Sequence, residues 1–263
     1  MDLELDGNAA LVTASSSGLG RASAKALAAE GANVAICARG EEKLEDAKAE
    51  IDAAGDGDVV AVPTDITDPD EIAALVDATV EEFGGLDHVI TSAGGPPSGS
   101  FLDTTERDWY EAYDLLVMSA VRVTKAAHPH LVESDAGSIV NVTSTSVREA
   151  IDGLVLSNSV RRAVIGLMKT QAREWAPDVR ANAVLPGAHE TPRIQELVEA
   201  SVERGEYDSY DDGMEDWSSG IPLECVGDPR ELGDTVAFLS SNRASYINGV
   251  AVPVDGGAGA SNL

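Results

Sequence analysis

The stretch AALVTASSSGLG at residues 9–20 decides the fold. Its first five residues form a short apolar run that predicts a buried strand, and a Ser/Gly turn leads from it into a helix around residues 21–30. Small residues let the backbone approach a pyrophosphate, and the helix N-terminus offers free N–H groups and a positive dipole end. The stretch therefore predicts the first turn of an α/β fold with a nucleotide site at its opening.

The rest of the chain repeats this strand and helix alternation. Strands are predicted at residues 9–13, 33–37, 59–63, 86–91, 138–142, 180–185 and 251–254. Helices are predicted at residues 21–30, 41–54, 68–83, 106–131, 157–175 and 229–239. Regular alternation with buried strands requires right-handed crossovers and a parallel sheet covered on both faces. The chain is therefore expected to be one Rossmann-like, doubly wound α/β domain, residues 1–263, with about seven strands.

The alternation lapses in one acidic segment, residues 191–220. The segment contains Tyr207, Tyr210, Met214 and Trp217 and is expected to pass over the sheet edge. It is either a substrate lid or a surface helical hairpin whose aromatic side chains pack on the body.

The charge balance excludes several kinds of partner. The chain carries 46 acidic and 18 basic side chains, a formal net charge of −28, so neither nucleic acid nor an anionic membrane is an expected ligand. The excess of Asp and Glu, with only five Lys, favours a protein from a salt-adapted organism, because salt screens the self-repulsion. No signal peptide, membrane span or cysteine framework is recognisable, and a cytoplasmic protein is expected.

The end of the second predicted strand bears on cofactor choice. Arg39 follows Cys37 and Ala38 with no acid beside it. An acid at this point would bind an adenosine 2′-hydroxyl, whereas a guanidinium suits a 2′-phosphate. Arg39 therefore favours NADP over NAD, the alternative being a solvated Arg at a strand end.

Five spaced motifs follow one another along the chain. Thr13, Gly18 and Gly20 match a Thr-Gly-x-x-x-Gly-x-Gly pattern, with Ala14 at its first glycine. TSAG stands at residues 91–94, NAVLPG at 182–187, and YING and VDGG at 246–249 and 254–257. In this order they resemble the short-chain dehydrogenase/reductase family, although that family has Asn-Asn-Ala-Gly where this chain has TSAG. The resemblance covers essentially the whole chain and implies a nicotinamide cofactor and oxidoreductase activity.

The resemblance also implies cofactor contacts. Asp65 looks like the acid that contacts the adenine amino group, and the segment that ends at Thr191 is similar to the one that cradles the nicotinamide. The predicted cofactor-binding residues are Thr13, Ser15, Ser17, Gly18, Leu19, Gly20, Arg39, Asp65, Ile66, Ser92, Ala93, Gly94, Pro186, Gly187 and Thr191.

The family's catalytic pattern is broken in this chain. Its members use a Tyr, a Lys four residues later, a Ser thirteen residues before the Tyr, and an Asn on the preceding long helix. Ser144 matches, but the other three positions hold Ser157, Arg161 and Leu116. A Ser hydroxyl is shorter and far less acidic than a phenol, and a guanidinium stays charged, so neither can relay a proton as the Tyr and Lys do.

Two other side chains are candidates for the missing roles. Arg148 would bind a substrate carboxylate, or would simply pair with Glu149 or another acid. His189 follows the nicotinamide segment and has a usable pKa, although a lone loop His is more often an ordinary polar residue. The predicted catalytic residues are Ser144, Ser157, Arg161, Arg148 and His189, and no metal site is expected.

Two functions remain open at this point. The first is an NADP(H)-dependent oxidoreductase that acts on a small carbonyl or hydroxy compound with altered proton-transfer residues. The second is a dinucleotide-binding family member that has lost dehydrogenase activity and serves as a sensor, a scaffold or a non-redox enzyme. The resemblance also implies a homo-oligomer, a tetramer or a dimer, assembled through the long helices 106–131 and 157–175.

Overall fold

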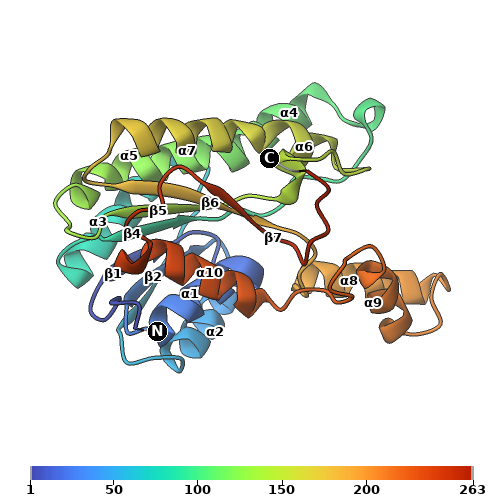
Figure 1. The fold of residues 1–263 in the computed structure, drawn as a ribbon, viewed down its shortest axis with the longest axis horizontal. Helices are drawn as coiled ribbons and strands as arrows, with labels where there is room; N and C mark the ends of the chain where they lie inside the picture. The colour runs from blue at the N-terminus through green and yellow to red at the C-terminus, as the bar shows by residue number, and fades with distance from the viewer. Residues whose placement is uncertain (1, 262–263) are drawn as a thin grey trace.

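The structure is a computed structural model that describes residues 2–261, apart from the side chains of residues 193 and 200. Its centre is a seven-stranded parallel sheet with the strand order β3-β2-β1-β4-β5-β6-β7 (Figure 1). The strands are β1 (Ala9–Val12), β2 (Asn33–Ala38), β3 (Val59–Pro63), β4 (His88–Thr91), β5 (Ser138–Val142), β6 (Arg180–Pro186) and β7 (Ala251–Val254). The predicted doubly wound α/β fold is confirmed.

The inner strands of the sheet are buried on both faces, whereas the edge strands β3 and β7 are partly exposed. Burial on both faces determines the composition of the inner strands. On β1, Ala10 and Val12 contribute to one apolar core, while Leu11 between them contributes to the other. Successive side chains of a strand point to opposite faces, so a strand covered on both sides is apolar throughout. Short apolar runs were therefore a sufficient signal for these strands.

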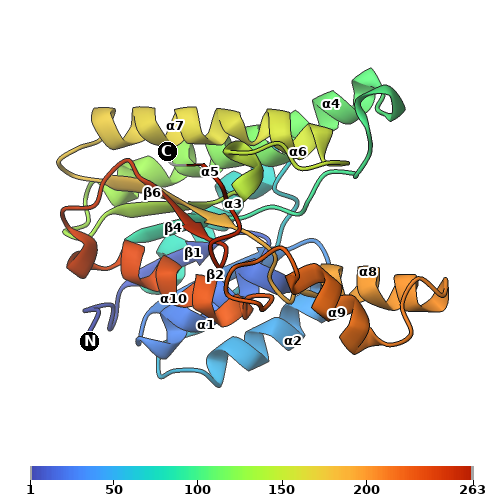
Figure 2. The same cartoon turned by 45° about the vertical axis from the view of Figure 1, so that its right-hand side comes forward.

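Helices cover both faces of the sheet (Figures 1 and 2). One face carries α1 (Gly18–Ala29), α2 (Glu41–Asp52) and α10 (Pro229–Ser240). The other carries α3 (Pro69–Phe83), α4 (Glu106–Tyr113), η2 (Asp114–Met118), α5 (Ser119–Leu131), α6 (Val155–Val160) and α7 (Arg162–Glu174). Single 3₁₀ turns occur at η1 (Phe101–Asp103), η3 (Thr145–Val147) and η4 (Asn242–Ala244).

Two predicted helices are interrupted. The helix expected over residues 106–131 contains a π-helical turn, η2, between α4 and α5. The helix expected over residues 157–175 starts earlier, at Val155, and breaks at Arg161 between α6 and α7. Both breaks lie beside the carboxyl end of β5, where side chains converge on the candidate site.

The segment of residues 191–220 forms two helices, α8 (Pro192–Glu203) and α9 (Tyr210–Ser218), which extend outward from the body (Figures 1 and 2). Gly213 of α9 lies against Val198 and Tyr207, and the Tyr207 hydroxyl donates to Asp216 at 2.7 Å. Tyr210 donates to Glu190 at 3.2 Å. The two helices therefore pack on each other as a hairpin, and the role of this hairpin as a substrate lid stays a prediction.

The helices of the described range include none with the length and apolar character needed to cross a bilayer.

Candidate active site

A cleft of about 780 Å³ runs along the carboxyl edge of the sheet. It crosses the ends of several neighbouring strands, the position at which doubly wound folds bind ligands. Its lining residues are Ala14, Ser16, Ser17, Gly18, Leu19, Gly20, Ala38, Arg39, Gly40, Lys43, Thr64, Asp65, Ile66, Thr67, Ser92, Ala93, Gly94, Gly95, Glu111, Leu115, Val142, Thr143, Arg161, Thr191 and Pro192. Most of the predicted cofactor-binding residues therefore meet in one place.

The Ser/Gly turn forms the middle of this cleft. Ser17 is the N-cap of α1, yet its side chain caps no backbone N–H, so the first N–H groups of the helix are open to a ligand. A Cβ at Gly20 would collide with the carbonyl oxygen of Ala14, which explains the glycine. Ala14 itself has a φ of 49° where the family motif has glycine, a conformation that costs a residue with a Cβ roughly 1 kcal/mol. The turn keeps the shape of a phosphate-binding loop at this local cost.

Positive side chains mark one end of the cleft. Arg39 after β2 and Lys43 on the first turn of α2 both line it. Nearby, Asp65 accepts hydrogen bonds from the Thr67 amide at 2.9 Å and the Thr67 hydroxyl at 2.7 Å. These bonds, with a smaller contribution from Arg39, hold the pKa of Asp65 below its usual value, so the carboxylate is a fixed acceptor. This end offers two cations and one acceptor, which suits a phosphorylated adenosine.

Other residues predicted to bind the cofactor support the loops instead of lining the cleft. The Thr13 hydroxyl donates to the Ser92 carbonyl at 2.7 Å and accepts from its amide at 2.8 Å. Ser15 is fully buried, donates to Val12 at 2.8 Å and accepts from the Cys37 amide at 3.0 Å. They join the turn after β1 to the ends of β4 and β2.

Pro186 and Gly187, at the end of β6, do not line the cleft. Pro186 closes the strand, and the Gly187 amide donates to the Val254 carbonyl at 3.0 Å. A Cβ at Gly187 would stand 2.8 Å from the Asp255 side chain. Pro186 and Gly187 therefore guide the chain toward Thr191, which does line the cleft.

Three serines gather at the carboxyl end of β5. The Ser144 Oγ accepts from the Ser146 amide at 3.1 Å, and the Ser146 and Ser157 hydroxyls lie 3.0 Å apart. Ser157 is 7% exposed, so its hydroxyl is held by its neighbour inside the protein. Leu116, at the position of the family's Asn, is buried in an apolar cluster with Leu156. Ser157, at the position expected to hold the family's Tyr, is thus paired with Ser146, and Leu116, at the position expected to hold its Asn, is apolar and buried.

Arg161 lies one helical turn after Ser157 and, unlike the three serines, lines the cleft. It is 9% exposed, and its Nη1 donates a long hydrogen bond of 3.4 Å to the Thr143 carbonyl. Its Nε is buried and donates to nothing in the described part of the chain. Burial lowers the pKa of the guanidinium to about 10, which still leaves it charged near neutral pH.

The structure places Arg148 and His189 away from this cluster. The Arg148 Nη2 donates to the Ala251 carbonyl at 3.1 Å, and the side chain lines a small separate hollow with Glu149 and Asp255. The His189 ring is buried against Gly227, and burial lowers its pKa. Like Ser144 and Ser157, neither is among the residues that line the cleft. Within residues 2–261 their side chains hydrogen-bond to backbone carbonyls and not to the serines, so their positions do not support the catalytic roles expected for them.

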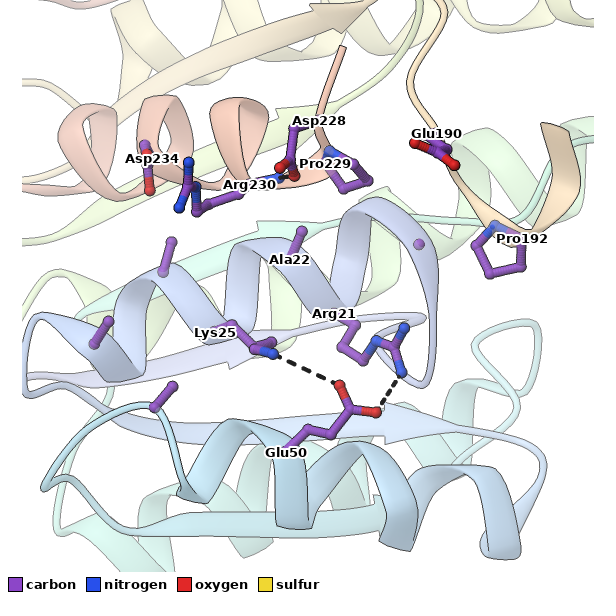
Figure 3. Close-up of a pocket in the computed structure, with 14 residues that line it drawn as sticks. Arg21, Ala22, Lys25, Glu50, Glu190, Pro192, Asp228, Pro229, Arg230 and Asp234 are labelled. Atoms are coloured by element: carbon purple, nitrogen blue, oxygen red, sulfur yellow. Dashed lines mark hydrogen bonds and ion pairs between the residues drawn. The ribbon is translucent and has the colours of Figure 1, made fainter. Parts of the chain in front are cut away.

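A second hollow, of about 420 Å³, lies between α1 and α10 (Figure 3). Arg21 and Lys25 point toward Glu50 of α2, which they reach at 2.9 and 3.6 Å (Figure 3). These two cations are thus paired with a carboxylate, and on the α10 side the third cation, Arg230, stands among Asp228 and Asp234. The larger cleft therefore remains the better candidate for an anionic dinucleotide.

Comparisons with known proteins agree with this geometry. The family model described as "Enoyl-(Acyl carrier protein) reductase" matches residues 13–259. The 2,5-dichloro-2,5-cyclohexadiene-1,4-diol dehydrogenase LinX of Sphingobium indicum is 35% identical over 254 residues, 96% of either chain. The chain belongs to the short-chain dehydrogenase/reductase family. Another relative of the family, the 3-oxoacyl-[acyl-carrier-protein] reductase FabG of Thermotoga maritima, is 30% identical over 97% of this chain and 99% of its own length.

Solved structures of the family superimpose closely. The L-sorbose reductase of Gluconobacter frateurii, in a complex with NADPH and L-sorbose, has a TM-score of 0.94, 28% identity and coverage of 99% and 100% of the two chains. A variant of the actinorhodin polyketide ketoreductase with NADPH has a TM-score of 0.88, 30% identity and coverage of 97% and 98%. These matches confirm the identification as an oxidoreductase of this family and support a nicotinamide dinucleotide as its cofactor.

Some residues of the candidate site were missed by reasoning from the sequence. Lys43 stands four residues after Arg39, on the first turn of α2, and its place in the cleft depends on where that helix begins. Ser146 lies two residues after Ser144, but only the 3₁₀ turn η3 brings it to Ser157. Glu111 reaches the cleft from α4, and nothing in its sequence context pointed there.

Proposed function

We propose that this protein is an NADP(H)-dependent oxidoreductase that exchanges a hydride with a small carbonyl or hydroxy compound and uses proton-transfer residues that differ from the family's. The observation that carries the proposal is the single cleft, which has an open helix N-terminus at its middle, cations at one end and Arg161 at the other. A dinucleotide needs the open helix N-terminus for its pyrophosphate and a polar site beyond β2 for its adenosine, and Arg161 lies toward the opposite end of the same cleft.

The choice of NADP over NAD rests on the cations at the adenosine end. Arg39 and Lys43 line the cleft where an acid would otherwise bind the 2′-hydroxyl. A guanidinium and an ammonium together suit the charge of a 2′-phosphate. The L-sorbose reductase complex, which contains NADPH, supports the same choice by likeness.

The substrate end offers serine hydroxyls, and the residues that line the cleft include no tyrosine whose phenol could supply the proton. When bound, the nicotinamide supplies or accepts the hydride. Ser144, which accepts from the Ser146 amide, is the hydroxyl that would donate to a substrate oxygen. Ser157 is held by Ser146 and is too weak an acid to supply a proton near neutral pH. We therefore propose that Ser144 polarises the carbonyl, that Arg161 stabilises negative charge, and that water from the open side of the cleft carries the proton.

A second function is favoured by the same substitutions. Leu116 is buried in an apolar cluster and Ser157 is engaged, so the family's proton relay has no counterpart among the described residues. A dinucleotide-binding protein without dehydrogenase activity, acting as a sensor, a scaffold or a non-redox enzyme, would have the same structure.

A titration and an absorbance screen separate the two functions. The chain is titrated with NADPH and NADH, and loss of nicotinamide absorbance is then followed with a panel of small carbonyl compounds. Turnover on any member supports the oxidoreductase. Tight NADPH binding without turnover on the whole panel supports the second function, and failure to bind either dinucleotide contradicts both.

Three further properties remain proposals. The excess of acidic side chains supports a salt-adapted protein. A cytoplasmic location and a homo-oligomer, a tetramer or a dimer, are proposed from the family. The exposed aromatic side chains on α4, Tyr110 and Tyr113, lie on one of the long helices expected in that interface.

A further inference from the structure

Arg161 is a buried cation without a partner of opposite charge. No ion pair joins it to a carboxylate within residues 2–261, and burial is the single influence on its pKa. This is unexpected in a chain with 46 acidic side chains. A buried charge that lacks both a counter-ion and a full set of hydrogen bonds destabilises a fold, so the position needs another explanation.

Arg180 shows how this protein satisfies a guanidinium that serves the fold. Arg180 is the first residue of β6, and its guanidinium reaches the C-terminal end of α10. There it donates to the carbonyls of Leu239, Ser240 and Ser241 at 2.8, 2.9 and 3.0 Å. Carbonyls at a helix C-terminus are a favourable site for a cation. Arg161, by comparison, has one hydrogen bond of 3.4 Å and a buried Nε without an acceptor. Its guanidinium therefore does not serve the fold in the way that Arg180 does.

The position of Arg161 in the cleft indicates which kind of ligand its guanidinium would bind. It lies beside Thr143 at the end of β5, whereas the open N-terminus of α1 follows β1 and Arg39 follows β2. With strands about 4.8 Å apart, β5 is about 10 Å from β1 and about 14 Å from β2. The phosphates of a dinucleotide have their own positive sites at β1 and β2, so Arg161 is free for a different anion.

We propose that Arg161 binds a carboxylate group of the substrate, which makes small oxo- or hydroxycarboxylates the substrate class. This inference rests on the proposed function for the identity of the cleft. A guanidinium presents paired N–H donors in a plane that matches a carboxylate, and a neutral ligand would leave the buried charge uncompensated. Leu115 and Ala93 line the same cleft and provide apolar surface for the uncharged part of such a molecule.

The test compares a carboxylate with a neutral molecule of the same shape. Oxamate and oxamide are titrated calorimetrically into the full chain with saturating NADPH and without it, at one fixed salt concentration, and acetate serves as a still smaller carboxylate. We expect oxamate to bind at least tenfold more tightly than oxamide. Arg161→Met should abolish this preference, Arg161→Lys should retain part of it, and Arg162→Met, at an exposed neighbouring position, should leave it unchanged.

Three results would overturn the inference. The first is equal affinity of the wild-type chain for oxamate and oxamide, with no binding of acetate. The second is a preference for carboxylate that survives Arg161→Met. The third is an Arg161→Met variant that loses NADPH affinity by tenfold or more, which would assign Arg161 to the cofactor. If NADPH itself does not bind, the proposed function fails, while titration of the chain alone still decides the carboxylate site.

Discussion

Replacing Arg161 by Met should make the protein more stable, which is the reverse of the usual result for a buried side chain. Met keeps most of the apolar stem of the side chain and removes the charged group. The group lost makes one hydrogen bond of 3.4 Å, to the Thr143 carbonyl, and pairs with no carboxylate among the described residues. The variant therefore loses little and is relieved of a buried charge.

The size of the effect follows from the burial of the guanidinium. Burial lowers its pKa from 12.5 to about 10, and at about 1.36 kcal/mol for each pKa unit the charged form is penalised by about 3 kcal/mol. The lost hydrogen bond offsets about 1 kcal/mol of this. The free energy of unfolding should therefore rise by about 1 to 3 kcal/mol, a gain of several degrees in Tm for a chain of this size.

Urea unfolding of three variants provides the assay. Arg180→Met removes the donors for the last carbonyls of α10 and should lower the free energy of unfolding by about 3 to 5 kcal/mol. Arg162→Met, at an exposed position, should change it by less than about 0.5 kcal/mol. If Arg161→Met lowers the free energy of unfolding as Arg180→Met does, the guanidinium is part of the fold and the reasoning is refuted.

Further predictions concern the cofactor, the substrate oxygen, pH and salt. Arg39→Ala should weaken NADPH binding tenfold or more in a calorimetric titration and NADH binding less than threefold, and equal losses would contradict the 2′-phosphate assignment. Ser144→Ala should lower the hydride-transfer rate by about 10², and an unchanged rate would show that its hydroxyl has no such role. His88 is fully buried against Asn8 and Ser138, and burial lowers its pKa to about 4. Folding therefore favours the neutral ring, and the stabilisation that is complete above pH 6.5 should be lost toward pH 4. The free energy of unfolding, measured by urea unfolding at each pH, should fall by about 3 kcal/mol over this range. The fall should be smaller in His88→Gln. NADPH is an anion and is repelled by the net charge of −28, so its affinity should rise from low to molar salt as the salt screens this repulsion. A steady fall in affinity would show that this repulsion does not limit binding.

The sheet was predictable from the sequence, and the breaks in its helices were not. Strands buried on both faces are mostly apolar, so runs such as Val34 to Cys37 were readable without tertiary information. The π-turn around Leu116 and the break at Arg161 depend on how the long helices pack beside the end of β5. No local pattern encodes such packing.

The residues at the proposed cofactor end of the site were easier to predict from the sequence than those at the proposed substrate end. The Ser/Gly turn and Asp65 are local motifs, and the structure places them in the cleft. The contact of Ser157 with Ser146 and the burial of His189 against Gly227 depend on the paths of loops. Spacing along the chain could identify those side chains but not the direction in which they point.

Transfer of a labelled hydride tests the central proposal most directly. NADPH carrying deuterium at the transferable position is incubated with the chain and a pool of small carbonyl compounds, both neutral compounds and oxo acids, and the products are analysed by mass spectrometry. The proposed function predicts deuterium in at least one alcohol product, with the amount reduced by Ser144→Ala. NADPH that binds tightly but leaves every carbonyl compound unlabelled would contradict it and favour a dinucleotide-binding protein without dehydrogenase activity.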